Sequence, residues 1–77
     1  METIEDKILD SASFAYGVDR DQLTLETRLR NLSQVSIKLV AFISNIEEKT
    51  DVYINPRIAM NLETIQEYVD KVKEELA

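Results

Sequence analysis

The fold is decided by residues 36–49, which read SIKLVAFISNIEEK. On a helix that turns about 100° per residue, these residues separate into two apolar arcs. The broader arc would face a protein core and consists of Leu39, Phe42, Ile43 and Ile46. The second arc lies where a helix of a small bundle meets solvent, and it consists of Ile37, Val40 and Ala41, beside Ser44 and Glu48. We interpret this second arc as a candidate contact surface, with ordinary core-margin residues as the alternative.

Two further helical patterns flank this segment. Residues 3–16 carry apolar side chains at helical spacing, with Thr3 placed to cap the start and Gly17 placed to end the helix in a left-handed conformation. Residues 64–67 read Thr-Ile-Gln-Glu, which is a capping box, and they open a narrow apolar stripe that predicts a final helix. The members of this stripe are Ile65, Tyr68, Val69, Val72 and Leu76. Pro56 suits the first turn of a short helix that continues through residues 57–60, and an ordered turn is the alternative for so short a segment.

The connection over residues 18–35 fits no sustained period. So long a connection is unusual in a small domain unless its own apolar side chains pack it, and here five aliphatic residues are available. They are Val18, Leu23, Leu25, Leu29 and Leu32. The sequence therefore predicts an all-α fold, a small four-helix bundle with an up-down arrangement, three main helices, one short helix and a long ordered loop between the first two. The predicted core consists of Ile4, Ile8, Leu9, Ala12, Leu32, Leu39, Ile43, Ile46, Ile54, Ile65, Val69 and Val72.

The amino-acid composition excludes most kinds of catalytic and metal-binding site. The 77 residues include 9 Lys and Arg, 15 Asp and Glu, and neither Cys nor His, and the net charge is −6. We expect one acidic domain over residues 1–77 that is not an enzyme, because zinc sites of Cys and His, Cys nucleophiles and Ser-His couples are absent. Residues 19–21 lack the further ligands of a calcium loop, so no metal site is expected. The acidic charge argues against nucleic acid and leaves a helix-turn-helix protein as a minor alternative.

The N-terminal residues are acidic, and no apolar run approaches the length of a membrane span. We therefore expect a cytoplasmic location without membrane insertion.

Ser36 stands where the long loop meets the second main helix, at a plausible N-cap position. The ordinary role of a serine there is to accept a hydrogen bond from a backbone N–H in the first turn. Ser33 could cap the helix instead, which would leave Ser36 within the first turn. The carboxylates Glu47 and Glu48 do not form an acid/base pair in this pattern, since adjacent residues of a helix point about 100° apart.

Residues 27–37, TRLRNLSQVSI, resemble the loop and attachment motif of the acyl and peptidyl carrier proteins. In order along the chain, that motif consists of an apolar residue, two unspecified residues, Leu-Gly, two more residues of which the second is Asp, and then Ser followed by Leu or Ile. Ser36 falls on the attachment serine, and the resemblance continues through residues 43–54 and 61–65. It implies that a phosphopantetheinyl transferase moves 4′-phosphopantetheine from coenzyme A to Ser36. The thiol of the arm would then carry acyl or aminoacyl groups as thioesters between loading and synthase enzymes, with the carrier as a monomer.

The departures from the motif cluster around the serine. Val35 replaces the usual acidic residue, and Ser33 replaces the usual Gly. Positive charge near the serine comes from Arg28, Arg30 and Lys38. Typical carriers present an acidic second helix to basic partner enzymes, and here only Glu47 and Glu48 keep that pattern. Two interpretations remain open for Arg28 and Arg30. They either belong to a solvated face of the loop, or they contact the partner or the phosphodiester.

We therefore expect an acyl carrier protein for a specialised biosynthetic pathway, although fatty-acid, polyketide, peptide and surface-polymer pathways use similar carriers. The expected partner contacts are Ile37, Val40, Ala41, Ser44, Glu47 and Glu48. Possible modulators of modification are Arg28, Arg30, Val35 and Lys38. The alternative is an unmodified carrier-like protein that acts as a protein interaction adaptor.

Overall fold

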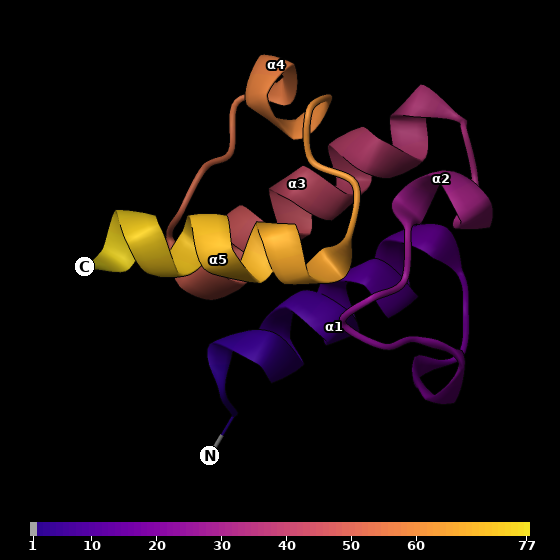
Figure 1. The fold of residues 1–77 in the computed structure, drawn as a ribbon, viewed down its shortest axis with the longest axis horizontal. Helices are drawn as coiled ribbons and strands as arrows, with labels where there is room; N and C mark the ends of the chain where they lie inside the picture. Colours follow the sequence, from indigo (N-terminus) through magenta and orange to yellow (C-terminus); the bar gives the residue numbers. More distant parts are fainter. Residues whose placement is uncertain (1) are drawn as a thin grey trace.

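The computed structural model describes residues 2–77, which form helices joined by ordered loops within 30 × 29 × 20 Å (Figure 1). The three long helices are α1 (Ile4–Tyr16), α3 (Ser36–Thr50) and α5 (Ile65–Leu76). The short ones are the 3₁₀ turn η1 (Arg20–Gln22), α2 (Leu29–Leu32) and α4 (Pro56–Ala59). The predicted all-α bundle with three main helices is confirmed. The predicted long loop is in fact divided by η1 and α2, which the sequence pattern did not indicate.

The helix α1 packs against both α3 and α5. In Figure 1, α1 runs in one direction and α3 and α5 both run back. The predicted up-down alternation therefore holds from α1 to α3 and stops there, because residues 51–64, which include α4, return the chain to the end where α3 begins. None of the helices within residues 2–77 combines the length and the apolar content required to cross a bilayer.

The predicted start and end of α1 and the predicted start of α5 are confirmed. Thr3 Oγ1 accepts from the Asp6 N–H at 3.1 Å, and the Asp6 carboxylate accepts from the Thr3 N–H at 3.4 Å. Gly17 ends α1 with φ 65° and ψ 36°, a left-handed conformation that glycine adopts without a Cβ clash. At α5, Thr64 Oγ1 accepts from the Glu67 N–H at 3.2 Å, and Glu67 Oε1 accepts from the Thr64 N–H at 3.0 Å.

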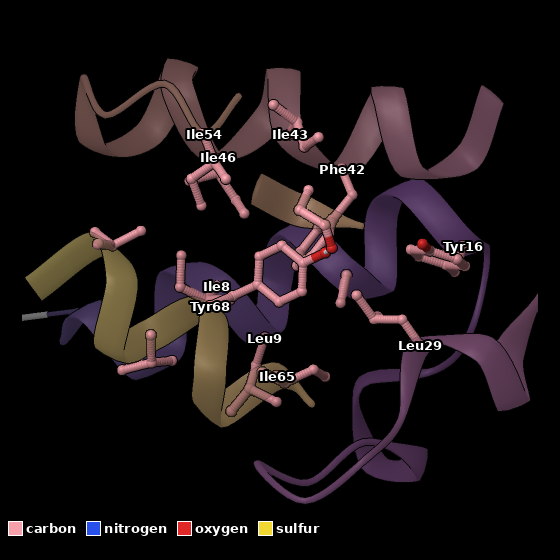
Figure 2. Close-up of a cluster of buried hydrophobic side chains, with 14 of the residues drawn as sticks. Ile8, Leu9, Tyr16, Leu29, Phe42, Ile43, Ile46, Ile54, Ile65 and Tyr68 are labelled. Carbon is pink, nitrogen blue, oxygen red and sulfur yellow. Dashed lines mark hydrogen bonds between the residues drawn. The ribbon is translucent and has the colours of Figure 1, made fainter. Parts of the chain in front are cut away.

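The centre of the core is aromatic. The ring of Phe42 meets the rings of Tyr16 and Tyr68 edge to face, with centroid distances of 6.0 and 4.9 Å. Figure 2 shows Tyr16 and Leu29 toward one side of this cluster and the aliphatic side chains of α3 toward another. The buried Tyr68 hydroxyl donates to the Ala59 carbonyl at 3.1 Å, which ties α5 to α4. This bond supplies the partner that a buried phenol requires.

Most of the predicted core is confirmed. The buried members are Ile8, Leu9, Ala12, Ile43, Ile46, Ile54, Ile65, Val69 and Val72. Ile4, Leu32 and Leu39 are only partly buried, because Ile4 begins α1, Leu32 ends α2 and Leu39 lines a groove. The prediction omitted seven residues of the buried hydrophobic core, which are Tyr16, Leu23, Leu29, Phe42, Val52, Ala59 and Tyr68. Several lie in segments without helical period, and the aromatic ones lie on or beside the apolar stripes and fill the centre through their size.

The connection between α1 and α3 is packed and hydrogen-bonded, as its aliphatic content predicted. Leu23 and Leu29 are buried, and three backbone bonds fasten the connection to the start of α5. They join Gln66 N–H to Leu25 O (2.8 Å), Ile65 N–H to Thr27 O (3.1 Å) and Leu29 N–H to Glu63 O (3.0 Å). Arg20 in η1 also pairs with Asp6 and Asp10 of α1 at 3.3 and 3.1 Å. The path of the chain toward Ser36 is therefore fixed by α1 and α5.

Candidate functional site

Ser36 is the first residue of α3, and its side chain is exposed. The N-cap is Val35, with φ −76° and ψ 118°, and within residues 2–77 no side chain caps this helix. The prediction that Ser36 or Ser33 caps α3 is therefore wrong. A capping hydroxyl turns back from a residue whose own backbone is outside the helix, whereas Ser36 already lies within the first turn. Its hydroxyl is not engaged as a cap.

A three-residue linker, residues 33–35, holds Ser36 in place. The Ser33 N–H donates to the Leu29 carbonyl at 3.1 Å and closes α2. The Ser33 hydroxyl accepts from the Val35 N–H at 3.1 Å, a local serine turn that directs the chain out of α2. The Lys38 N–H then donates to the Val35 carbonyl at 3.1 Å and opens α3. Because Leu29 is buried, the whole linker is attached to the core.

A groove of about 300 Å³ adjoins Ser36. Its walls come from the end of α1, from α2, from the linker, from the start of α3, from residues 59–62 and from α5. The lining residues are Tyr16, Leu29, Arg30, Ser33, Gln34, Val35, Ser36, Leu39, Ala59, Met60, Leu62 and Tyr68. Burial raises the pKa of the Tyr16 and Tyr68 hydroxyls above the ordinary value of 10.0, so both stay neutral. The groove presents polar and apolar surface in similar amounts, and Ser36 is one of its polar lining residues.

The charges near Ser36 are positive. Residues 28–46 contain no Asp or Glu, and their charged members are Arg28, Arg30 and Lys38. Arg28 Nη1 pairs with Glu63 Oε2 at 2.9 Å, so this arginine serves the attachment of the loop to the start of α5. Arg30 is exposed at the rim of the groove, and Lys38 is half-buried in the first turn of α3. Of the two arginines, only Arg30 lines the groove beside the serine.

The predicted partner contacts lie along α3. Ile37, Val40 and Ser44 are exposed, and Ala41 is half-buried beside them. Glu47 and Glu48 are exposed at the opposite end of α3, roughly 16 Å from Ser36 at the helical rise per residue. The structure therefore keeps the apolar residues close to the serine and the two carboxylates far from it.

Sequence reasoning missed the part of the groove that residues 59–62 form. Met60 is exposed directly after α4, Ala59 is buried at the end of α4, and both line the groove. Residues 51–62 carry no period that would have indicated this position, and it is the packing of α4 on Tyr68 that brings Met60 to the groove.

The site fits a covalently held phosphate group. The hydroxyl of Ser36 is exposed, uncapped and at the start of a 15-residue helix, whose first N–H groups and dipole favour an anion. The surrounding residues 28–46 add no carboxylate that would repel it. The adjoining groove provides both polar and apolar surface next to Ser36.

A comparison with protein families agrees with this geometry. The family model described as "Phosphopantetheine attachment site" matches residues 6–72, which include Ser36, all of α3 and every wall of the groove. Members of this family are the sites of covalent 4′-phosphopantetheine attachment, and they carry substrates for other enzymes without being catalytic themselves. The resemblance to carrier proteins is thus confirmed, and the chain belongs to the phosphopantetheine attachment site family.

Proposed function

We propose that this carrier protein holds 4′-phosphopantetheine on Ser36 and carries acyl or aminoacyl groups for a specialised biosynthetic pathway, as one carrier domain over residues 1–77. The observation that supports Ser36 is its exposed, uncapped hydroxyl at the start of α3, beside the groove. Ser33 is a poorer candidate for receiving the phosphopantetheine group, since its hydroxyl already accepts a hydrogen bond from the Val35 N–H. Ser44 is exposed but lies two turns further along α3, away from the helix start.

Ser36 is an acceptor and needs help from another protein. Its oxygen forms a bond to a phosphorus of coenzyme A, the bond from that phosphorus to the nucleotide part breaks, and adenosine 3′,5′-bisphosphate leaves. Residues 28–46 hold no carboxylate, and the chain has no His or Cys to take the hydroxyl proton, so the transferase supplies the base. When bound, the group supplies a terminal thiol that holds the cargo as a thioester.

The partner enzymes dock along α3 in this proposal. Ile37, Val40, Ala41 and Ser44 form one exposed face that starts directly after the attachment residue. A partner on this face would have the cargo tethered beside its own active site, which raises the effective concentration of the substrate. Glu47 and Glu48 would contact the far margin of the partner.

The pathway is proposed from the departures around the serine. Val35, Ser33 and Lys38 give this site a surface unlike the acidic one of typical carriers. A carrier with an unusual surface suits dedicated enzymes rather than bulk fatty-acid synthesis.

The test is the intact mass of the protein before and after incubation with coenzyme A and a broad-specificity phosphopantetheinyl transferase. We expect a gain of one phosphopantetheine in the natural protein and none in Ser36→Ala. Ser44→Ala is the matched control, because it removes another exposed serine of the same helix and should be loaded normally. Circular dichroism should show the same helical content in all three proteins.

Two results would overturn parts of this proposal. Loading of Ser36→Ala would mean that another residue accepts the group. Absence of loading in the folded natural protein, with several transferases, would favour the unmodified adaptor that Val35 and its basic neighbours also suggest.

A further inference from the structure

The charge of the molecule is distributed unevenly around Ser36. Residues 28–46 contribute three positive charges and no negative ones, in a chain of net charge −6, which leaves −9 on the other residues. Ion pairs within residues 2–77 engage Arg20, Arg28, Lys71 and Lys73, and no carboxylate lies within salt-bridge distance of Arg30 or Lys38. The charges next to Ser36 are therefore free to act outside the molecule.

Exposed apolar side chains occupy the same region. Val35, Ile37 and Val40 are 55%, 68% and 49% exposed in the linker and the first two turns of α3. Met60 is 69% exposed and lines the same groove as Val35. Aliphatic side chains this exposed next to one another are typical of a surface that another protein covers. We name the surface formed by Arg30, Val35, Ile37, Lys38, Val40 and Met60 the basic-apolar face.

We propose that the basic-apolar face binds partner proteins whose docking surface is apolar at its centre and acidic at the part of its margin that meets Arg30 and Lys38. This inference rests on the proposed function, because it takes the enzymes that act on the Ser36 site as the proteins that bind this face. It goes beyond the proposed function by stating the charge of their docking surfaces. Ile37 and Val40 would enter the apolar centre, and Arg30 and Lys38 would meet carboxylates on either side. The charge asymmetry would turn this face toward an acidic partner during the approach, while the rest of the carrier is repelled.

The positive charges beside Ser36 make a basic docking surface a poorer fit to this face than an acidic one. A lysine-rich partner would meet Arg30 and Lys38 directly, and the nearest exposed carboxylates on α3, Glu47 and Glu48, lie roughly 16 Å from Ser36. That distance exceeds the screening length of about 8 Å at physiological ionic strength. The two glutamates therefore do not offset the positive charge at the serine.

Two designed helical peptides provide the test, each with one leucine stripe, flanked by glutamates in the first peptide and by lysines in the second. Each is titrated into isotopically labelled carrier, and the backbone amide resonances are followed. We expect the glutamate peptide to shift the resonances of residues 35–41 and 60, against the net negative charge of the carrier. The lysine peptide should leave those resonances in place.

A variant in which the charges of Arg30 and Lys38 are reversed tests their role. Arg30→Glu with Lys38→Glu should weaken binding of the glutamate peptide about tenfold and create binding of the lysine peptide at the same residues. Lys7→Glu with Lys49→Glu is the matched control, because it changes the net charge equally at positions outside the face and should leave the glutamate peptide bound.

Several results would overturn the proposal. The first is stronger binding of the lysine peptide than of the glutamate peptide to residues 35–41 of the natural protein. The second is equal binding of both peptides. The third is that the affinity of neither peptide changes when Arg30 and Lys38 are replaced. Failure of Ser36 to accept phosphopantetheine in the mass experiment is a separate result, because the peptide titrations use the unmodified protein and do not depend on loading.

Discussion

At the scale of single residues, two buried polar side-chain atoms in the bundle have no hydrogen-bond partner within residues 2–77. They are Ser11 Oγ on α1 and Asn45 Oδ1 on α3, two helices that pack against each other. Ser11 is fully buried, so its hydroxyl has lost water without gaining a protein partner. Such a group costs stability, because desolvation is not compensated.

Ser11→Ala is therefore expected to raise the free energy of unfolding by about 1 kcal/mol, since it removes the unpaired hydroxyl and places a better helix former in α1. Urea unfolding followed by circular dichroism measures the change. Ser13→Ala is the matched control on the same helix. The Ser13 hydroxyl donates to the Val18 carbonyl at 2.6 Å, so its loss should destabilise by about 1 kcal/mol. A destabilised Ser11→Ala would show that this hydroxyl has a partner, such as a buried water.

At the scale of the elements, the end of α3 is held in an unusual backbone conformation. Asp51 follows the helix with φ 62° and ψ 17°, in the left-handed region that favours Gly and Asn. Its carboxylate is also exposed at the negative end of the helix dipole, where a negative charge is unfavourable.

Asp51→Asn should stabilise the protein by about 0.5 kcal/mol, because it keeps a side chain that tolerates the left-handed conformation and removes the charge. Asp51→Val should destabilise it by more than about 1 kcal/mol, since a β-branched residue clashes in that region. The urea midpoints of the two variants and the natural protein give the comparison. Equal midpoints for Asn and Val would mean that residue 51 is not left-handed in solution.

The helix ends also show what could be predicted from sequence. Thr3 and Thr64 are each followed three residues later by a carboxylate, and this local pattern is enough to specify a cap. The start of α3 could not be assigned in the same way, because Ser33 and Ser36 were both plausible caps. The contact that decides it is the bond from the Val35 N–H to the Ser33 hydroxyl, within a linker attached through buried Leu29.

The same reasoning explains why α2 and the groove were not predicted. A four-residue helix is too short to show a period, and α2 is placed by the burial of Leu29 and by its N–H bond to the Glu63 carbonyl, 34 positions away. The groove takes its walls from several elements, so its shape depends on how they pack. Ser36 could be proposed as the attachment residue because the motif around it is local in sequence.

At the scale of the whole molecule, residues 63–67 connect the last helix to the segment that precedes Ser36. The Glu67 carboxylate accepts from the N–H groups of Glu63 and Thr64 at 3.1 and 3.0 Å and so holds the start of α5. Glu63 in turn binds the Leu29 N–H through its carbonyl and Arg28 through its carboxylate. Leu29 begins the helix that leads into the linker before Ser36. One carboxylate therefore supports both the cap of α5 and the position of the loop.

This arrangement predicts the pH dependence of stability. The backbone N–H groups of Thr64 and Glu63 hold the pKa of Glu67 below its ordinary value of 4.5, and the hydrogen bond from Lys73 at 2.7 Å lowers the pKa of Glu5. Both carboxylates thus stabilise the fold above about pH 4.5, and this stabilisation is lost as the pH falls through their lowered values in the folded protein.

Glu67→Gln should be less stable than the natural protein at neutral pH and should lose less stability between about pH 6 and pH 3, so that the two curves approach each other in acid. The glutamine keeps an oxygen acceptor for the two N–H groups but has no charge to lose. Urea unfolding at several pH values measures both curves, and Glu75→Gln, on the exposed last turn of α5, is the control that should follow the natural protein. Parallel curves for Glu67→Gln and the natural protein would show that acid acts elsewhere. In the expected case, the protection factors of residues 25–29, which are the intrinsic amide exchange rates at each pH divided by the measured rates, should also fall in acid. The reason is that the loop before Ser36 is fastened to the segment that Glu67 holds.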